Sequence, residues 1–201
     1  MDFGKAKQNL EERGYKVSVF ETAAEAAAYL DGAIDGTTVS FGGSVTLDQM
    51  GLYEMLEKHN EVHWHWRVPE GATASEILKK AMTTDVYVSS VNGLAETGEI
   101  VNIDGNCNRV ASIMFGHKKV YLVVGCNKVQ PDYDAALYYA RNVAAPKNAQ
   151  RLKKKTPCAV NADRCYDCKS PERICRGLSV LWTKPGAEEC EVVLIGEELG
   201  Y

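Results

Sequence analysis

The sequence lacks an apolar run long enough to cross a membrane, and it lacks an excess of positive charge. Its longest apolar stretches, such as residues 120–125, are far shorter than the roughly 20 residues of a spanning helix. Lys and Arg number 23 and Asp and Glu number 27, so the formal net charge is −4. That balance argues against broad nucleic-acid binding and leaves only a local basic patch open. Residues 1–8 lack the apolar core of a secretory signal, so we expect a cytoplasmic protein.

The composition is that of a folded globular protein. The 201 residues are 45% hydrophobic and 25% charged, and a chain of this length can bury a sizeable core. Neither an internal repeat nor a low-complexity tract interrupts it. We expect a single α/β domain over residues 1–201, with a Cys-rich segment at residues 156–176 inside it.

Strand-like and helix-like patterns alternate along most of the chain. Thr22, Thr46 and Thr73 each precede a Glu or Gln by three residues, the spacing of a capping box at a helix start. Residues 94–105 predict a β-hairpin that turns at Thr97-Gly98. The order of elements indicates a mostly parallel sheet with helices on both faces. We expect helices over residues 2–13, 22–31, 47–58, 74–83, 108–115 and 132–144, and strands over residues 15–20, 37–41, 62–66, 86–91, 119–125, 178–183 and 191–196.

The alternation of strand-like and helix-like patterns stops over residues 146–178, which are interrupted by prolines and a run of lysines. This stretch contains four of the seven cysteines. Their spacing is C-x6-C-x2-C-x6-C, and the inner pair is placed so that two thiolates can reach one metal. Interleaved Arg and Lys residues lower the pKa of nearby thiols. The segment predicts a Zn²⁺ site or an iron–sulfur cluster; unconnected cysteines or one or two disulfides are the alternatives. The predicted ligands are Cys158, Cys165, Cys168 and Cys175.

Gly42-Gly43-Ser44 joins a predicted strand to a predicted helix. Backbone amides in such a turn, with a helix N-terminus behind them, can bind an anion, and glycine lets a ligand come close. Ser44 and Thr46 add hydroxyl groups. The turn is neither G-x-G-x-x-G nor a P-loop, so a plain strand–helix turn capped by Thr46 is the alternative.

Three more side chains near the predicted hairpin are candidates for a site. Glu96 at the hairpin turn is suited to acid/base or nucleophilic chemistry, although surface glutamates are common in hairpins. Arg109, at an expected helix start, suits a phosphate or carboxylate, or equally a surface ion pair. We predict a catalytic role for Glu96 and a small-anion site made of Gly42, Gly43, Ser44, Thr46, Asn106 and Arg109.

His63 and His65 alternate with two tryptophans on a predicted strand. Two histidines on one face could ligate a metal, but no third ligand lies nearby in sequence. A packed, partly exposed strand near a sheet edge is the favoured interpretation. No convincing Ser-His-Asp set is present.

Together these segments resemble the lactate-utilisation (LUD) domain family in its short stand-alone form, over nearly the whole chain. The departures are Cys107, where a glycine is expected, and Leu94-Ala95 before Glu96. The resemblance is carried by Phe41-Gly-Gly-Ser-Val-Thr-Leu47, Asn92-Gly-Leu-Ala-Glu-Thr-Gly98, Ile100-Val-Asn-Ile-Asp-Gly-Asn106, Asn108-Arg-Val-Ala111, Ala145-Pro-Lys-Asn-Ala149, Thr156-Pro-Cys158, Cys165-x-x-Cys168, Ser170-Pro-Glu-Arg-Ile-Cys175 and Val193-Leu-Ile-Gly-Glu-Glu-Leu-Gly-Tyr201.

The resemblance implies an α/β fold like that of ribose-phosphate isomerases and CoA transferases. In such folds small anionic ligands bind at the carboxyl ends of the strands, beside Gly-rich loops. Related domains are associated with oxidation of L-lactate to pyruvate alongside iron–sulfur partners.

Three functional hypotheses follow. In the first, the protein binds a small anion in lactate or 2-hydroxy-acid utilisation, and the cysteines carry an iron–sulfur cluster or a structural metal. In the second, it is a non-catalytic assembly or redox-regulatory partner of an iron–sulfur oxidoreductase. In the third, it is a CoA-transferase-like or sugar-phosphate isomerase-like enzyme that uses Glu96 or Glu99.

Overall fold

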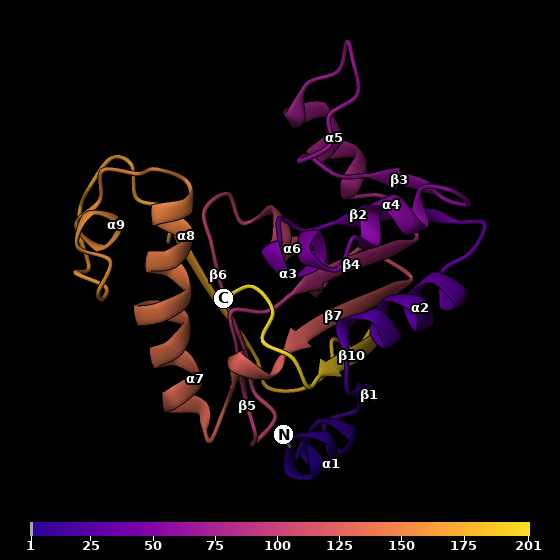
Figure 1. The fold of residues 1–201 in the computed structure, drawn as a ribbon, viewed down its shortest axis with the longest axis horizontal. Coiled ribbons are helices and arrows are strands. Elements are labelled where there is room, and N and C mark those ends of the chain that lie inside the picture. Colours follow the sequence, from indigo (N-terminus) through magenta and orange to yellow (C-terminus); the bar gives the residue numbers. More distant parts are fainter. Residues whose placement is uncertain (1) are drawn as a thin grey trace.

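The computed structural model describes residues 2–201 and contains two β-sheets. The larger sheet has six strands in the order β1-β10-β7-β4-β2-β3, and all of its neighbouring strands run parallel (Figure 1). This confirms the predicted α/β fold with a mostly parallel sheet. The strands are β1 (Lys16–Phe20), β2 (Thr38–Phe41), β3 (Glu61–His63), β4 (Val86–Ser90), β7 (Lys119–Gly125) and β10 (Glu189–Ile195).

Alternating side chains of β7 and β10 build a core on each face of this sheet. Tyr121 and Val123 of β7 pack with helices α2 (Ala23–Ala33), α3 (Val45–Gln49) and α4 (Leu52–Leu56). Val120, Leu122 and Val124 point to the opposite face, because successive strand residues alternate. That face is covered by α1 (Gly4–Glu12), by α6 (Asn108–Met114) and by residues of the second sheet.

The predicted hairpin is part of a four-stranded second sheet rather than a local insertion. Its strands β5 (Gly93–Ala95) and β6 (Ile100–Asp104) pair antiparallel. β8 (Val129–Gln130) and β9 (Gly177–Leu181) complete the order β8-β5-β6-β9. β9 comes after the Cys-rich segment, so this segment is tied to the hairpin through strand pairing.

The predicted helix over 132–144 is wrong at its end, because the helix continues past Pro146. Helix α7 (Tyr133–Tyr139) leads into a π-helical turn, η2 (Ala140–Ala144), and then into α8 (Ala145–Arg151). Proline lacks an N–H and its ring collides with a regular i−4 carbonyl. The wider π turn directly before Pro146 relieves that conflict. A short helix, α9 (Pro157–Asn161), then begins the Cys-rich segment.

Two other predictions need correction near the carboxyl end of β2. The expected helix over 47–58 is two helices, because Gly51 between them adopts a left-handed φ of 61°. The capping boxes at Thr22 and Thr73 are confirmed, the latter on α5 (Ala74–Ala81). The one at Thr46 is wrong: Ser44 caps α3, and its hydroxyl accepts the Leu47 amide at 3.4 Å.

The carboxyl ends of four adjacent parallel strands lie along one edge of the larger sheet. From these ends the chain continues into Gly42–Ser44 after β2, Val91-Asn92 after β4, the 3-10 turn η1 (Cys126–Lys128) after β7 and the C-terminal tail after β10. In parallel α/β sheets this edge is where ligands bind. Among residues 2–201, no helix has the length and apolarity that crossing a membrane would require.

Candidate functional site

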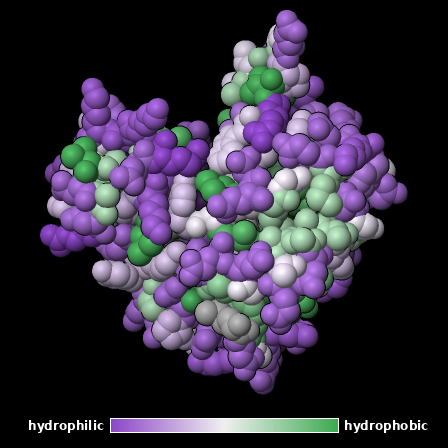
Figure 2. Space-filling model, in the orientation of Figure 1, coloured by the Kyte–Doolittle hydropathy of each residue, from purple (hydrophilic) through white to green (hydrophobic). Residues whose placement is uncertain are grey.

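A cavity of about 620 Å³ lies at this carboxyl edge. Its walls come from the loops after β2, β4 and β7, from the start of α6, from α8 and from residues 171–176. Figure 2 shows this face of the molecule recessed between the α8 side and the lobe that carries α5. The volume lies within the range of about 300–1,000 Å³ that small-molecule sites occupy.

Cationic side chains dominate the charge around this cavity. Six Lys or Arg residues line it, against two carboxylates, Asp104 and Glu172. Asp104 already accepts the backbone amides of Arg109 and Val110, at 3.0 and 3.1 Å, and Glu172 accepts the amide of Lys155 at 2.8 Å. The excess of positive charge in a chain of net charge −4 favours an anionic ligand. The six cations are Arg109, Lys128, Arg151, Lys154, Arg173 and Arg176.

Lys128, at the end of η1, is the most deeply placed of these cations. Only 2% of the residue is exposed. Its Nζ donates to the hydroxyls of Thr46 and Ser90, both at 2.8 Å. Burial, and secondly the charge of Arg109, lower the pKa of Lys128 from 10.5 to about 7. The ammonium group is therefore poorly stabilised in the absence of an anion.

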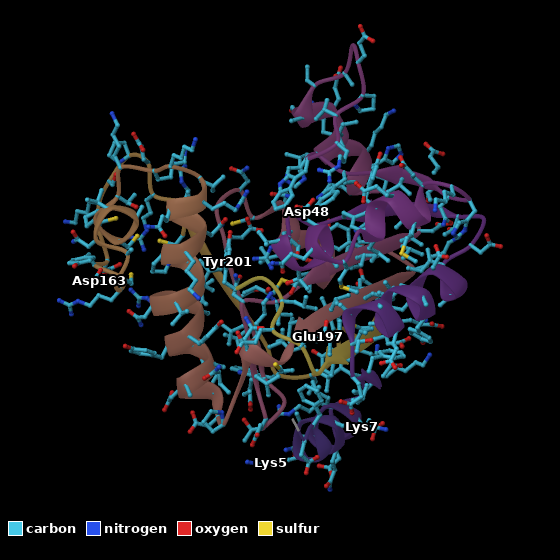
Figure 3. All side chains as sticks on the ribbon, in the orientation of Figure 1. Lys5, Lys7, Asp48, Asp163, Glu197 and Tyr201 are labelled. Atoms are coloured by element: carbon cyan, nitrogen blue, oxygen red, sulfur yellow. The ribbon has the colours of Figure 1, made fainter. Side chains whose placement is uncertain are left out.

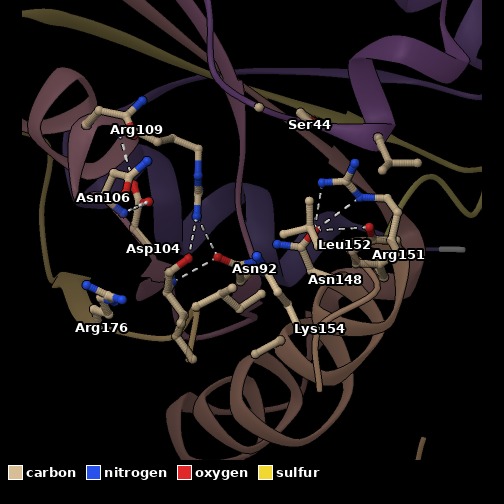
Figure 4. A pocket seen from close by; sticks show the side chains of 18 of the residues that line it. Ser44, Asn92, Asp104, Asn106, Arg109, Asn148, Arg151, Leu152, Lys154 and Arg176 are labelled. Carbon is tan, nitrogen blue, oxygen red and sulfur yellow. Dashed lines mark hydrogen bonds between the residues drawn. The ribbon is translucent and has the colours of Figure 1, made fainter. Parts of the chain in front are cut away.

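Arg109 is buried and joins the two sheets (Figure 4). Its Nη1 donates to the Ser90 carbonyl at the end of β4 and to Asn102 Oδ1 in β6. Its Nη2 donates to Asn92 Oδ1 and to the carbonyl oxygen of Ile103. With all four terminal N–H groups engaged by neutral oxygens, Arg109 acts on the cavity through its charge. Burial lowers its pKa from the ordinary value.

The Gly-rich turn contributes Gly43 and Ser44 to the cavity wall, whereas Gly42 and Thr46 lie behind it. A Cβ on Gly42 would lie 2.6 Å from Ser89 Oγ, so only glycine fits there. A Cβ on Gly43 would lie 3.2 Å from the His65 ring. Close packing thus explains both glycines. Thr46 is fully buried and, besides accepting Lys128 Nζ, donates to the Leu199 carbonyl at 3.1 Å.

Asn106 lines the cavity as predicted, but Glu96 is not among its lining residues. The Glu96 carboxylate lies 3.0 Å from Nζ of Lys5 on α1. In Figure 3, Lys5 lies at the bottom of the view, well separated from the cavity residue Tyr201. Glu99 is paired with Arg13 at 2.7 Å and also lies outside the cavity. A catalytic role for Glu96 stays a prediction without a place in this cavity.

An aromatic and amide wall faces the cations. Strand β3 ends at His63 rather than at the predicted position 66. His65 and Trp66 therefore lie in the loop after β3, and both line the cavity. Burial lowers the pKa of His65, so its ring is neutral at neutral pH. The Arg151 guanidinium lies 4.7 Å from the Trp66 ring centroid. It also donates to Asn148 Oδ1.

The C-terminal tail after β10 crosses this edge of the sheet and contributes Tyr201 to the cavity. Gln49 Oε1 accepts the Gly200 amide at 2.7 Å, and Asn127 Oδ1 accepts the Leu199 amide at 3.0 Å. Gly200 has a φ of 60°, and a Cβ there would lie 2.6 Å from Thr46 Oγ1. Thr46 and Gln49, predicted as a helix cap, thus hold the tail instead.

All four cysteines of the Cys-rich segment line one small cavity of about 10 Å³ beside α8, together with Arg141 and Arg173. The four are half-buried free thiols. Arg173 donates to the carbonyls of Cys168 and Cys175, both at 2.9 Å, and also lines the large cavity. Among residues 2–201, no three His, Cys, Asp or Glu side chains are arranged to hold one metal ion.

Cys107, the first departure from the family pattern, occupies a backbone position that favours glycine. Its φ is 62°, in the left-handed region. Its Sγ would lie 2.5 Å from a Cβ on Gly177. The cysteine is thus accommodated by a glycine on the neighbouring strand β9.

Several cavity residues were missed from the sequence. Lys128 and Asn92 each follow a predicted strand, so both could have been found by expecting ligands at the carboxyl end of every parallel strand. His65 was considered with His63 as a metal ligand, but its place in the cavity was not expected, because the predicted strand extended to residue 66 whereas β3 ends at His63. Arg173 and Arg176 were expected only as cations beside the cysteines, and nothing local marks Arg151 or Lys154. Long-range packing of α8 and the Cys-rich segment brings all four to the cavity.

Comparison with solved structures finds a similarity that covers nearly the whole chain. A DUF162 family protein from Deinococcus radiodurans superposes with a TM-score of 0.54 at 11% identity, covering 97% of this chain and 99% of that chain. Ribose 5-phosphate isomerase from Plasmodium falciparum (TM-score 0.32, 11% identity, 54% and 52% coverage) and eIF2B beta from Chaetomium thermophilum (TM-score 0.34, 11% identity, 66% and 44% coverage) are weaker similarities. No curated protein matches the chain significantly.

A scan against protein-family models matches the LUD domain over residues 4–195. That range includes both sheets and the four cysteines of the Cys-rich segment. The chain therefore belongs to the LUD domain family.

Proposed function

We propose that this protein binds a small anionic molecule in the cavity at the carboxyl edge of its larger sheet, as a component of lactate or 2-hydroxy-acid utilisation. The observation that carries the proposal is that buried Lys128 and Arg109 converge on one cavity while all their side-chain hydrogen bonds go to neutral oxygens. The charge of Asp104 acts on Arg109, but among the described residues no carboxylate is bonded to either cationic group. Uncompensated buried charge is costly. A bound anion would supply the missing countercharge.

The lining suits a carboxylate ligand with polar substituents. Lys128 offers charge at depth, while Asn148, Arg151 and Lys154 offer polar groups on the opposite wall. The association of the LUD family with lactate utilisation supports a 2-hydroxy or 2-oxo acid. The cavity is larger than lactate, so it leaves room for a bigger anion or a second substrate.

Binding is tested by ligand-dependent thermal stabilisation of the full chain. Lactate, pyruvate, inorganic phosphate, a nucleotide and CoA are each titrated, and a ligand that binds the native state must raise the melting temperature with its concentration. We expect at least one carboxylate or phosphate compound to raise it by several degrees, and added chloride to weaken the effect by screening. No shift with any of the five would refute the proposal.

A second proposal concerns the Cys-rich segment, which we infer holds Zn²⁺ or an iron–sulfur cluster through Cys158, Cys165, Cys168 and Cys175. Four free thiols around one cavity, with two arginines to offset their charge, form a donor set whose chemistry fits either group. The sulfurs would have to draw closer together to surround a single ion. Zinc would stabilise the segment, and a cluster would supply electron transfer.

Metal content and the ultraviolet–visible spectrum of anaerobically purified protein test this second proposal. We expect about one zinc, or a brown iron-containing sample, per chain. Changing Cys165 and Cys168 together to Ser should abolish binding of the zinc or iron. Cys190→Ser, at a buried position on β10, is the control and should keep the metal. Protein free of both zinc and iron would refute the proposal.

A metal at this place favours a second candidate function, that of a redox or assembly partner of an iron–sulfur oxidoreductase. Arg173 lines both the thiol cavity and the large cavity, and this shared residue supports a link between the two proposed sites. The third hypothesis, a carboxylate nucleophile of the CoA-transferase type, gains no support, since neither Glu96 nor Glu99 lines the cavity.

A further inference from the structure

The amine of Lys128 is surrounded by hydroxyl groups and lacks a carboxylate partner. Thr46 and Ser90 are its hydrogen-bond partners, each at 2.8 Å. Within residues 2–201, no Asp or Glu forms an ion pair with Nζ, and the charge that acts on it is that of Arg109. The tail approaches with Gly200, which carries no side chain; a Cβ there would lie 3.4 Å from Nζ.

The charged neighbour of this amine is another cation. Arg109 donates to the Ser90 carbonyl at 3.1 Å while Lys128 donates to the Ser90 hydroxyl, so both cations meet on one residue. A desolvated lysine beside a second cation loses its proton readily, which is how lysine nucleophiles are activated. The lowered pKa of about 7 agrees with this arrangement.

The hydroxyl partners can serve either protonation state of the amine. The Thr46 hydroxyl donates to the Leu199 carbonyl, so its oxygen accepts from Nζ. In the described part of the chain, the Ser90 hydroxyl has no hydrogen-bond partner besides Nζ. It can therefore accept from an ammonium or donate to a neutral amine.

We propose that Lys128 is a nucleophile that forms an imine with the carbonyl carbon of a small 2-oxo acid bound in the cavity. The inference rests on the proposed anion site and names its substrate class. Arg109 and the remaining cavity cations would balance the carboxylate, while the buried amine faces the adjacent carbonyl group. In the described part of the chain, the amine has hydroxyl groups rather than a carboxylate as its hydrogen-bond partners.

The step balances without an oxidant or a further reactant. The Nζ lone pair attacks the carbonyl carbon, and the carbonyl oxygen becomes a hydroxyl after proton transfer from nitrogen. The second proton of the amine passes to this hydroxyl, which leaves as water, and a carbon–nitrogen double bond remains on Lys128. The Ser90 hydroxyl is placed to relay the proton. Addition of water reverses the step and regenerates the amine and the 2-oxo acid.

Reductive trapping tests the proposal. The full chain is incubated with pyruvate, or with glyoxylate as a smaller probe, and treated with cyanoborohydride at pH 7. Intact mass should increase by one reduced adduct, and peptide mapping should locate it at Lys128. Lys128→Met should lose that adduct. Lys118→Met should keep it, since Lys118 is an exposed lysine paired with Asp85 at the opposite strand end.

The yield of the adduct at Lys128 should depend on the fraction of the amine that is neutral, so it should rise as the pH is raised past about 7. Lys128→Arg keeps the charge but cannot form an imine, so it should lose the adduct even if Lys128→Met fails to fold. Thermal stabilisation by pyruvate without an adduct at Lys128 would overturn the nucleophile and leave the anion site intact. An adduct spread over exposed lysines would also overturn it. The absence of stabilisation by any anion would instead refute the proposed function.

Discussion

Replacing Lys128 with Met should have a pH-dependent effect on the free energy of unfolding of the unliganded protein. Relative to wild type, the variant should be more stable at pH 7 than at pH 10. Met has a similar length and avoids burial of a charge. The native pKa of Lys128 is about 7, below its ordinary 10.5. Wild-type folding thus releases a proton between these two pH values, which costs free energy that the variant does not incur. Loss of the hydrogen bonds to Thr46 and Ser90 subtracts about 1 kcal/mol each at every pH.

The stability of wild type changes with pH because its folded and unfolded states bind the Lys128 proton with different affinities. Because the unfolded chain binds the proton more tightly, the Lys128 contribution to wild-type stability is complete above pH 10.5 and is lost as the pH falls to about 7. The difference between Lys128→Met and wild type should therefore shift in favour of the variant by about 3–5 kcal/mol from pH 10.5 to pH 7. Below pH 7 it should be flat. Urea unfolding of both proteins across this range measures it, and a constant difference would contradict a neutral buried lysine.

Replacing Arg109 with Met should destabilise the protein and lower the free energy of unfolding by about 3–5 kcal/mol. The change leaves two carbonyl oxygens and two side-chain amide oxygens without their donor. Asn102 is affected most, because it is fully buried and its Nδ2 already lacks a partner. The loss also removes the link between β4 and β6.

Urea unfolding at one pH compares this variant with wild type and with Arg176→Met. Arg176 also lines the cavity, but it is exposed and donates only to backbone carbonyls at 3.1 and 3.4 Å. Its replacement should cost no more than about 0.5 kcal/mol. Equal losses in the two variants would show that Arg109 is not the structural link between the sheets.

Much of the fold could be predicted from the sequence because local patterns mark buried parallel strands clearly. Residues 119–125 were predicted as a strand and form one, and Thr22 and Thr73 were found as caps from spacing alone. The second sheet was missed, since pairing of β6 with β9 joins segments about 75 residues apart in the chain. Nothing local to either strand indicates that partner.

Side chains with long-range partners were interpreted less well than backbone elements. Thr46 has the spacing of a capping box, but a buried lysine and the chain's own C-terminal tail compete for its hydroxyl and prevail. Arg109 was predicted as a ligand clamp or a surface ion-pair partner, and its donors are instead taken by two asparagines and two carbonyls. Such contacts depend on how both sheets meet, which periodicity does not encode.

Thermal stabilisation by pyruvate and by inorganic phosphate, compared across three proteins, tests the small-anion site most directly. Wild type and Lys118→Met should show the same concentration-dependent rise in melting temperature. A double variant, Arg151→Met with Lys154→Met, removes two cations from the cavity wall while leaving Lys128 and Arg109 in place. It should show a much smaller rise. An equal rise in all three proteins would place binding elsewhere, and no rise in any of them would contradict the account.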